Sequence, residues 1–117
     1  MSKAAKSVLV FGIYLVLNGI GFLLMPNTMF GLLGLPPTNE PWIQVVGMLL
    51  LFLAYYYIMS ARNELTILFR WSVYARATVI IFFSAFVVLG IAPAILIMFG
   101  VIDLLGAIWT ALALKTK

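Results

Sequence analysis

The chain has 117 residues, of which 66% are hydrophobic and 9% are charged, with no cysteine, no histidine and a formal net charge of +4. Too few polar residues are present to cover a water-soluble globule of this size, so the composition predicts a protein whose solvent is largely lipid. The missing residue types exclude disulfides, thiol redox chemistry, the usual zinc sites, imidazole haem ligation and histidine-based catalysis. Basic residues are dispersed rather than clustered, which argues against nucleic-acid binding.

Four apolar stretches are each long enough for a transmembrane helix, which needs about 20 apolar residues to cross about 30 Å of hydrocarbon. They lie near 7–25, 41–60, 66–90 and 93–114. The first follows two lysines as a secretory signal would, but its apolar run is long for a signal and no small-residue cleavage motif follows, so we expect a retained helix. The sequence therefore predicts an all-α, four-transmembrane-helix bundle that forms a single integral membrane domain over residues 1–117.

The basic residues predict which side of the membrane each end faces. If the N-terminus and the C-terminus are both cytoplasmic, Arg76 lies in the cytoplasmic half of the third span and no basic residue falls on the outer side. The other basic residues then all lie at cytoplasmic ends: Lys3, Lys6, Arg62, Arg70, Lys115 and Lys117. Because short loops follow the positive-inside rule most reliably, we expect a multi-pass protein of the inner (plasma) membrane in this orientation.

The longest connection, residues 26–40, is too apolar to extend into water, and Pro36 and Pro37 end any helix within it. We expect a short interfacial helix between the first two spans, with a lid over a pocket as the alternative. Glu40 precedes Pro41 at the start of the second span, which indicates a helix-start residue rather than a catalytic acid.

Asp103 lies close to the middle of the fourth span, where an acid costs about 2.5–3.5 kcal/mol to insert. Small and polar residues three, four and seven positions away share its face, which should therefore meet other helices; they are Gly100, Gly106, Ala107 and Thr110. The tight turn at 90–93 makes the last two spans antiparallel. Counted from this turn, Arg76 and Asp103 differ in depth along the helices by four residues, or about 6 Å. We predict a structural ion pair between Arg76 and Asp103.

Asn18 and Gln44 are further polar residues at membrane depth. One interpretation is that they form hydrogen bonds between helices, worth about 1 kcal/mol or less each. The alternative is a cavity that binds the polar end of a quinone or lipid. Its candidate ligand-binding residues are Asn18, Arg76, Asp103, Tyr14 and Thr110. We expect no catalytic residue, no metal site and no cofactor.

Six segments together resemble the DoxX-like and DUF4345-like groups of small four-helix bacterial membrane proteins: LNGIGFLLMP, LLGLPP, PWIQVVG, YYYIMSAR, RWSVYAR and DLLGAIWT. The resemblance implies a four-helix membrane bundle, and some members are linked to quinol oxidase or other redox assemblies. Without cysteine or histidine, this chain departs from any thiol or haem role. The chain is similar in size to small multidrug transporters, but it has Asn18 where they need a buried glutamate.

These features predict a nonenzymatic accessory subunit or assembly factor of a larger membrane complex, whose partners are the lipid bilayer and that complex or a second copy of the chain. The alternative is a binding or carrier protein for a hydrophobic molecule, with Arg76 and Asp103 orienting its polar end. An enzyme ranks third, because the three acids, Glu40, Glu64 and Asp103, lie far apart in the predicted topology.

Overall fold

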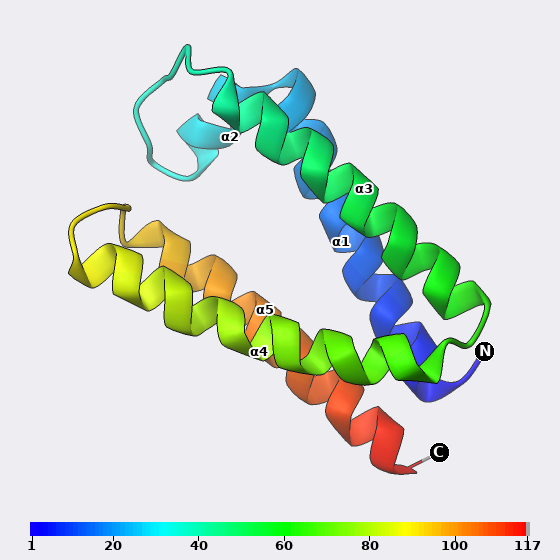
Figure 1. Cartoon of the computed structure of the whole chain (residues 1–117). Helices are drawn as coiled ribbons and strands as arrows, with labels where there is room; N and C mark the ends of the chain where they lie inside the picture. The colour runs from blue at the N-terminus through cyan, green and yellow to red at the C-terminus, as the bar shows by residue number, and fades with distance from the viewer. Residues whose placement is uncertain (117) are drawn as a thin grey trace. The chain divides into compact units, whose positions relative to one another are not determined.

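The computed structural model describes residues 1–116 and contains five helices, with no strand in that part of the chain (Figure 1). The helices are α1 (Lys3–Leu24), α2 (Pro26–Leu32), α3 (Trp42–Arg62), α4 (Thr66–Val88) and α5 (Ile95–Thr116). All except α2 are long and apolar enough to cross a membrane. The prediction of an all-α protein with four candidate spans is therefore confirmed.

The helix ends differ from the prediction by at most four residues, and two of these shifts have a clear local cause. The first helix begins at Lys3 because Ser2 caps it: the Ser2 Oγ accepts a hydrogen bond from the Ala5 N–H at 3.0 Å. The fourth helix ends at Val88 because Gly90 adopts a φ of +76°, a conformation that glycine adopts readily. Hydropathy alone marks the apolar run, whereas caps and turns set where the backbone hydrogen bonds stop.

The described chain forms two compact units. The α1–α3 unit comprises residues 9–59, and the α4–α5 unit comprises residues 1–8 together with the chain from Ser60 onward. The first residues of α1 thus belong to the α4–α5 unit and the rest of α1 to the other.

In the α1–α3 unit, α1 and α3 approach closely where two glycines meet. A Cβ placed on Gly47 would lie 2.6 Å from the Leu23 backbone N and 2.8 Å from the Gly19 backbone O. Nearby, the Gln44 Nε2 donates a hydrogen bond to the Leu23 O at 3.4 Å. Small residues at such crossings allow dispersion contacts between backbones, a common way for helices to associate in lipid.

The short helix α2 begins with Pro26, a residue favoured in the first turn because it needs no N–H partner there. It is followed by Gly34 at a φ of +75° and by a hydrogen bond from the Thr38 N–H to the Asn27 Oδ1 at 2.8 Å. A short helix, α2, thus lies between α1 and α3, whereas the predicted interfacial helix remains a prediction.

In the α4–α5 unit, a tight turn joins α4 to α5, and the two helices pack against each other. A Cβ on Gly100 would lie 3.0 Å from the Ile80 Cα, so this glycine allows close approach of the two helices. Gly100, Ala107 and Thr110 are all buried, which confirms that this face of α5 meets other helices. Packing also covers Phe69 of α4 and Val8 in the first part of α1.

Candidate functional site

Four polar side chains are buried together in the α4–α5 unit, and we call them the hydroxyl–arginine cluster. Ser7 comes from α1, Ser72 and Arg76 from α4, and Thr110 from α5, with exposed fractions of 1%, 5%, 2% and 0% respectively. Buried polar groups need hydrogen-bond partners, and a buried charge needs them most. The cluster therefore depends on how these four side chains satisfy one another.

Arg76 donates hydrogen bonds within its own helix, α4, and to α5. Within α4 its Nε donates to the Ser72 backbone O at 3.3 Å and its Nη2 donates to the Ser72 Oγ at 3.0 Å. The same Nη2 donates to the Thr110 Oγ1 of α5 at 2.8 Å. The guanidinium therefore joins α4 to α5 through charge-assisted hydrogen bonds, which are stronger than bonds between neutral groups.

The direction of the hydroxyl bonds follows from counting hydrogens. The Ser7 Oγ donates its single hydrogen to the Ala4 O at 2.7 Å, so its 2.7 Å contact with the Thr110 Oγ1 uses the hydrogen of Thr110. Thr110 in turn accepts from Arg76. The hydrogen bonds thus run in one direction from Arg76 through Thr110 and Ser7 to the Ala4 carbonyl, and such chains polarise one another favourably.

Ser72 is oriented in the same way. Its Oγ donates to the Phe69 O at 2.7 Å, one turn earlier in α4, and its oxygen then accepts from Arg76. Each hydroxyl of the cluster is therefore both donor and acceptor, with its hydrogen directed away from the cation. This arrangement presents only oxygen lone pairs to the guanidinium, which stabilises a charge removed from water.

Asp103 is half-buried on α5, two helical turns before Thr110 on the same face, and it interacts electrostatically with Arg76. The hydrogen bonds of Arg76 described above go instead to the neutral oxygens of Ser72 and Thr110. The ion pair of Arg76 with Asp103 therefore stays a prediction, supported by their electrostatic interaction.

Tyr14 and Asn18 lie in the α1–α3 unit. The Asn18 Nδ2 donates to the Tyr14 backbone O at 2.9 Å, one turn earlier in the same helix, and the Tyr14 ring lies 5.4 Å from the Phe11 ring. The structure thus brings Arg76 and Thr110 together, and separately Tyr14 and Asn18. Their convergence on one ligand cavity stays a prediction.

Sequence reasoning missed Ser7 and Ser72. Ser72 lies four residues before Arg76, and this spacing places the two on one face of α4, so the pair could have been recognised. Ser7 is 103 residues from Thr110 along the chain, and no local pattern links them. Only packing of the first turns of α1 against α5 brings the two hydroxyls together.

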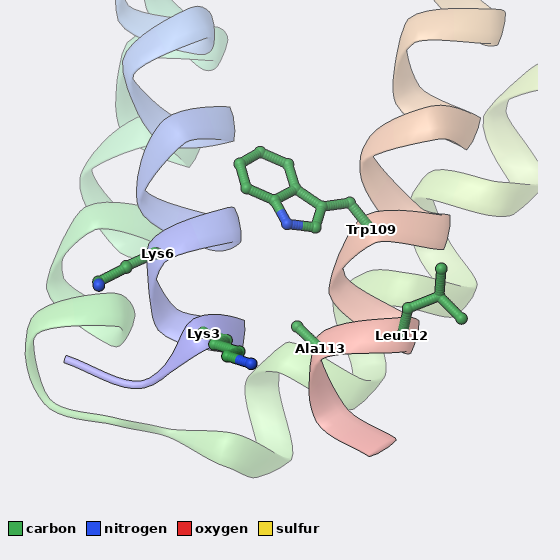
Figure 2. Close-up of a pocket in the computed structure, with 5 residues that line it drawn as sticks. All are labelled: Lys3, Lys6, Trp109, Leu112 and Ala113. Atoms are coloured by element: carbon green, nitrogen blue, oxygen red, sulfur yellow. The ribbon is translucent and has the colours of Figure 1, made fainter. Parts of the chain in front are cut away.

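A pocket lies at the end of the α4–α5 unit where the first turn of α1 meets the last turns of α5 (Figure 2). Lys3 and Lys6 of α1 line it together with Trp109, Leu112 and Ala113 of α5, and its volume is about 260 Å³. The pocket thus combines cationic groups with an apolar wall, unlike the hydroxyl–arginine cluster.

Glu64 lies at this end of the unit, in the connection between α3 and α4. Its Oε2 accepts a hydrogen bond from the Ser2 backbone N–H at 2.9 Å. Hydrogen bonds from the side chain and backbone of Ser2 lower the pKa of Glu64 below its ordinary value of 4.5. The contact links the start of α1 to the start of α4.

Four long apolar helices, with an arginine enclosed among hydroxyl groups, indicate a small all-α multi-pass membrane protein. Neither protein-family models nor curated proteins and solved structures match this chain significantly. The resemblance to DoxX-like proteins therefore stays a prediction.

Proposed function

We propose that this protein is a nonenzymatic accessory subunit or assembly factor of a larger complex in the inner membrane. The observation that carries this proposal is the outward face of α4, by which we mean the exposed face turned away from α5. This face is rich in aromatic side chains, and large side chains stand beside small ones. A face that contacts only lipid tails needs neither aromatic side chains nor such differences in side-chain size. The hydroxyl–arginine cluster then has a structural role, because its hydrogen bonds connect helices of this chain.

Large side chains are interspersed with small ones along the outward face of α4. Five of the large residues are between 58% and 84% exposed: Trp71, Tyr74, Ile81, Phe82 and Val88. The small residues Ala75, Thr78 and Ala85 are exposed between them. Steps of three and four residues place these side chains on one side of the helix, where small positions admit the side chains of a neighbouring transmembrane helix.

The second candidate, a carrier for a quinone or lipid, has the half-buried Asp103 beside Arg76 in its favour. It is less well supported, because Arg76 is 2% exposed and its Nε and Nη2 already donate to Ser72 and Thr110. A ligand at this place would have to displace those bonds. Native mass spectrometry from nanodiscs favours the carrier if a defined small molecule is retained by the parent protein and lost in Asp103→Asn.

Site-specific photocrosslinking in native membranes tests the accessory role. p-Benzoylphenylalanine replaces Phe82, which is 58% exposed on the outward face, and in a matched control it replaces Phe69 of the same helix, which is 1% exposed. We expect the probe at Phe82, but not at Phe69, to crosslink to subunits of one defined membrane complex. Deletion of the gene should also reduce the amount or size of that complex on native gels.

Two results would contradict the proposal. One is a probe at Phe82 that crosslinks only to lipid, in a protein that purifies as a monodisperse monomer. The other is a crosslinked complex whose amount and size do not change when this protein is deleted.

A further inference from the structure

The pocket between the first turn of α1 and the last turns of α5 is independent of the function proposed above. Figure 2 shows the Trp109 ring extending from α5 toward α1, and the Lys3 side chain extending toward Ala113. The Lys6 ammonium lies on the other side of α1 in this view. A cation and an indole ring thus lie at the two sides of one opening.

Hydrogen bonds hold the two helices together at this end. Ser7, one residue beyond Lys6, meets Thr110, one residue beyond Trp109, at 2.7 Å. The Ser2 N–H, next to Lys3, donates to the Glu64 carboxylate at 2.9 Å. The backbone segments that carry Lys3, Lys6 and Trp109 are therefore fixed relative to one another, while the lysine side chains keep their flexible four-carbon stems.

The charge at this end favours an anion. Lys3 and Lys6 line the pocket, and the Lys3 side chain extends toward Ala113 (Figure 2). The nearby acid, Glu64, already accepts the Ser2 N–H. Lysine ammonium groups bind phosphate as point charges, and basic residues near a membrane surface attract anionic lipid headgroups.

An apolar stripe on α5 leads away from the pocket toward the middle of the helix. Its exposed residues follow steps of four, three and four: Val101, Leu105, Ile108 and Leu112. At 1.5 Å per residue, the stripe is about 16 Å long, which matches much of one leaflet of the hydrocarbon core. A free phosphate ion would not contact this apolar surface, whereas the acyl chain of a lipid would pack against it.

We propose that this pocket binds an anionic phospholipid, with its phosphate at Lys3, its glycerol region against Trp109 and Ala113, and one acyl chain along the α5 stripe. Indole rings favour the headgroup boundary, because they present an apolar body and one N–H donor. The lipid would thus lie where α1 and α5 meet and would cover apolar surface of α5.

Quenching of Trp109 fluorescence by brominated lipids tests this proposal. Trp42→Phe and Trp71→Phe leave Trp109 as the sole tryptophan, and the protein is placed in phosphatidylcholine bilayers that contain brominated phosphatidylglycerol or brominated phosphatidylcholine. We expect stronger quenching by phosphatidylglycerol at equal bromine content. Replacing Lys3 with glutamine should reduce this preference about fivefold at low salt.

Lys115→Gln is the matched control, because it removes a charge at the same end of the unit from a residue that does not line the pocket. It should leave the preference nearly unchanged. Equal quenching by the two lipids, or an equal loss in Lys115→Gln, would overturn the proposal. If Lys3→Gln fails to fold, rising NaCl should weaken the preference in the Trp109-only protein, and a salt-independent preference would contradict the proposal.

Native mass spectrometry from mixed-lipid nanodiscs separates the two sources of phosphate. Retained phosphatidylglycerol supports the lipid site, and retained inorganic phosphate without lipid overturns it. A lipid that is lost in Lys3→Gln but kept in Asp103→Asn also separates this pocket from the carrier site considered above.

Discussion

Replacing Thr110 with valine tests whether the hydroxyl–arginine cluster stabilises the α4–α5 unit. Valine keeps the branched shape of threonine but removes the oxygen that accepts from Arg76 at 2.8 Å and contacts the Ser7 Oγ at 2.7 Å. The variant therefore loses two hydrogen bonds at a fully buried position without opening a cavity.

The size of the effect follows from the two bonds. A hydrogen bond to a charged group contributes about 1.5–3 kcal/mol and a neutral one about 0.5–1.5 kcal/mol in water-soluble proteins. Bonds between transmembrane helices average nearer 0.6 kcal/mol, because the unfolded reference state in a membrane also finds partners. We therefore expect Thr110→Val to lower the free energy of unfolding by about 2 kcal/mol, with the charged bond to Arg76 dominating.

The assay is reversible unfolding in mixed micelles, followed by circular dichroism. Thr78→Val is the matched control, because Thr78 is exposed and its hydroxyl donates only within α4, to the Tyr74 O at 2.7 Å. Thr110→Ser keeps the hydroxyl and should retain most of the stability. If Thr110→Val unfolds like Thr78→Val, the cluster does not stabilise the unit and the reasoning is wrong.

Three further predictions concern other contacts. Arg76→Lys should lower the free energy of unfolding by about 1–2 kcal/mol in the same assay, because lysine cannot reproduce the rigid fork of Nε and Nη2 donors; a stability equal to wild type would contradict this. Gly47→Ala should destabilise the α1–α3 unit by about 2 kcal/mol, because the new Cβ would meet backbone atoms at 2.6 and 2.8 Å. Gly31→Ala is the control and should not lower the stability, because nothing lies within 4 Å of its Cβ position. Equal effects of the two substitutions would refute the role of Gly47 in the close approach of α1 and α3. Carbon-detected NMR should give Glu64 a pKa below 4.5 that rises in Ser2→Ala, since this variant removes the side-chain hydrogen bond from Ser2 that lowers it, while the backbone N–H remains. Because the folded-state pKa is depressed, the stability from this contact is present above the ordinary pKa and is lost as the pH falls through the folded-state value. No rise in Ser2→Ala would exclude the Ser2 side chain as a cause.

Hydropathy determined the class of this protein and the positions of its four long helices. A run of about 20 apolar residues is a local property of the chain, and in lipid every backbone polar group must find its partner inside the helix. The four predicted stretches therefore became α1, α3, α4 and α5, with their ends shifted by at most four residues, and Ser2 and Gly90 set two of those ends. The small-residue face of α5 was predictable for the same reason, because helical periodicity is also local.

The partners of the buried arginine were decided by tertiary structure. Sequence reasoning chose Asp103 because opposite charge and similar depth are visible along the chain, whereas the hydrogen bonds described above go to Ser72 and Thr110. Thr110 is 34 residues from Arg76 and 103 from Ser7, so its role arises only when three helices pack together. Hydrogen bonds act over about 3 Å and depend on direction, and residue spacing alone specifies neither between separate helices.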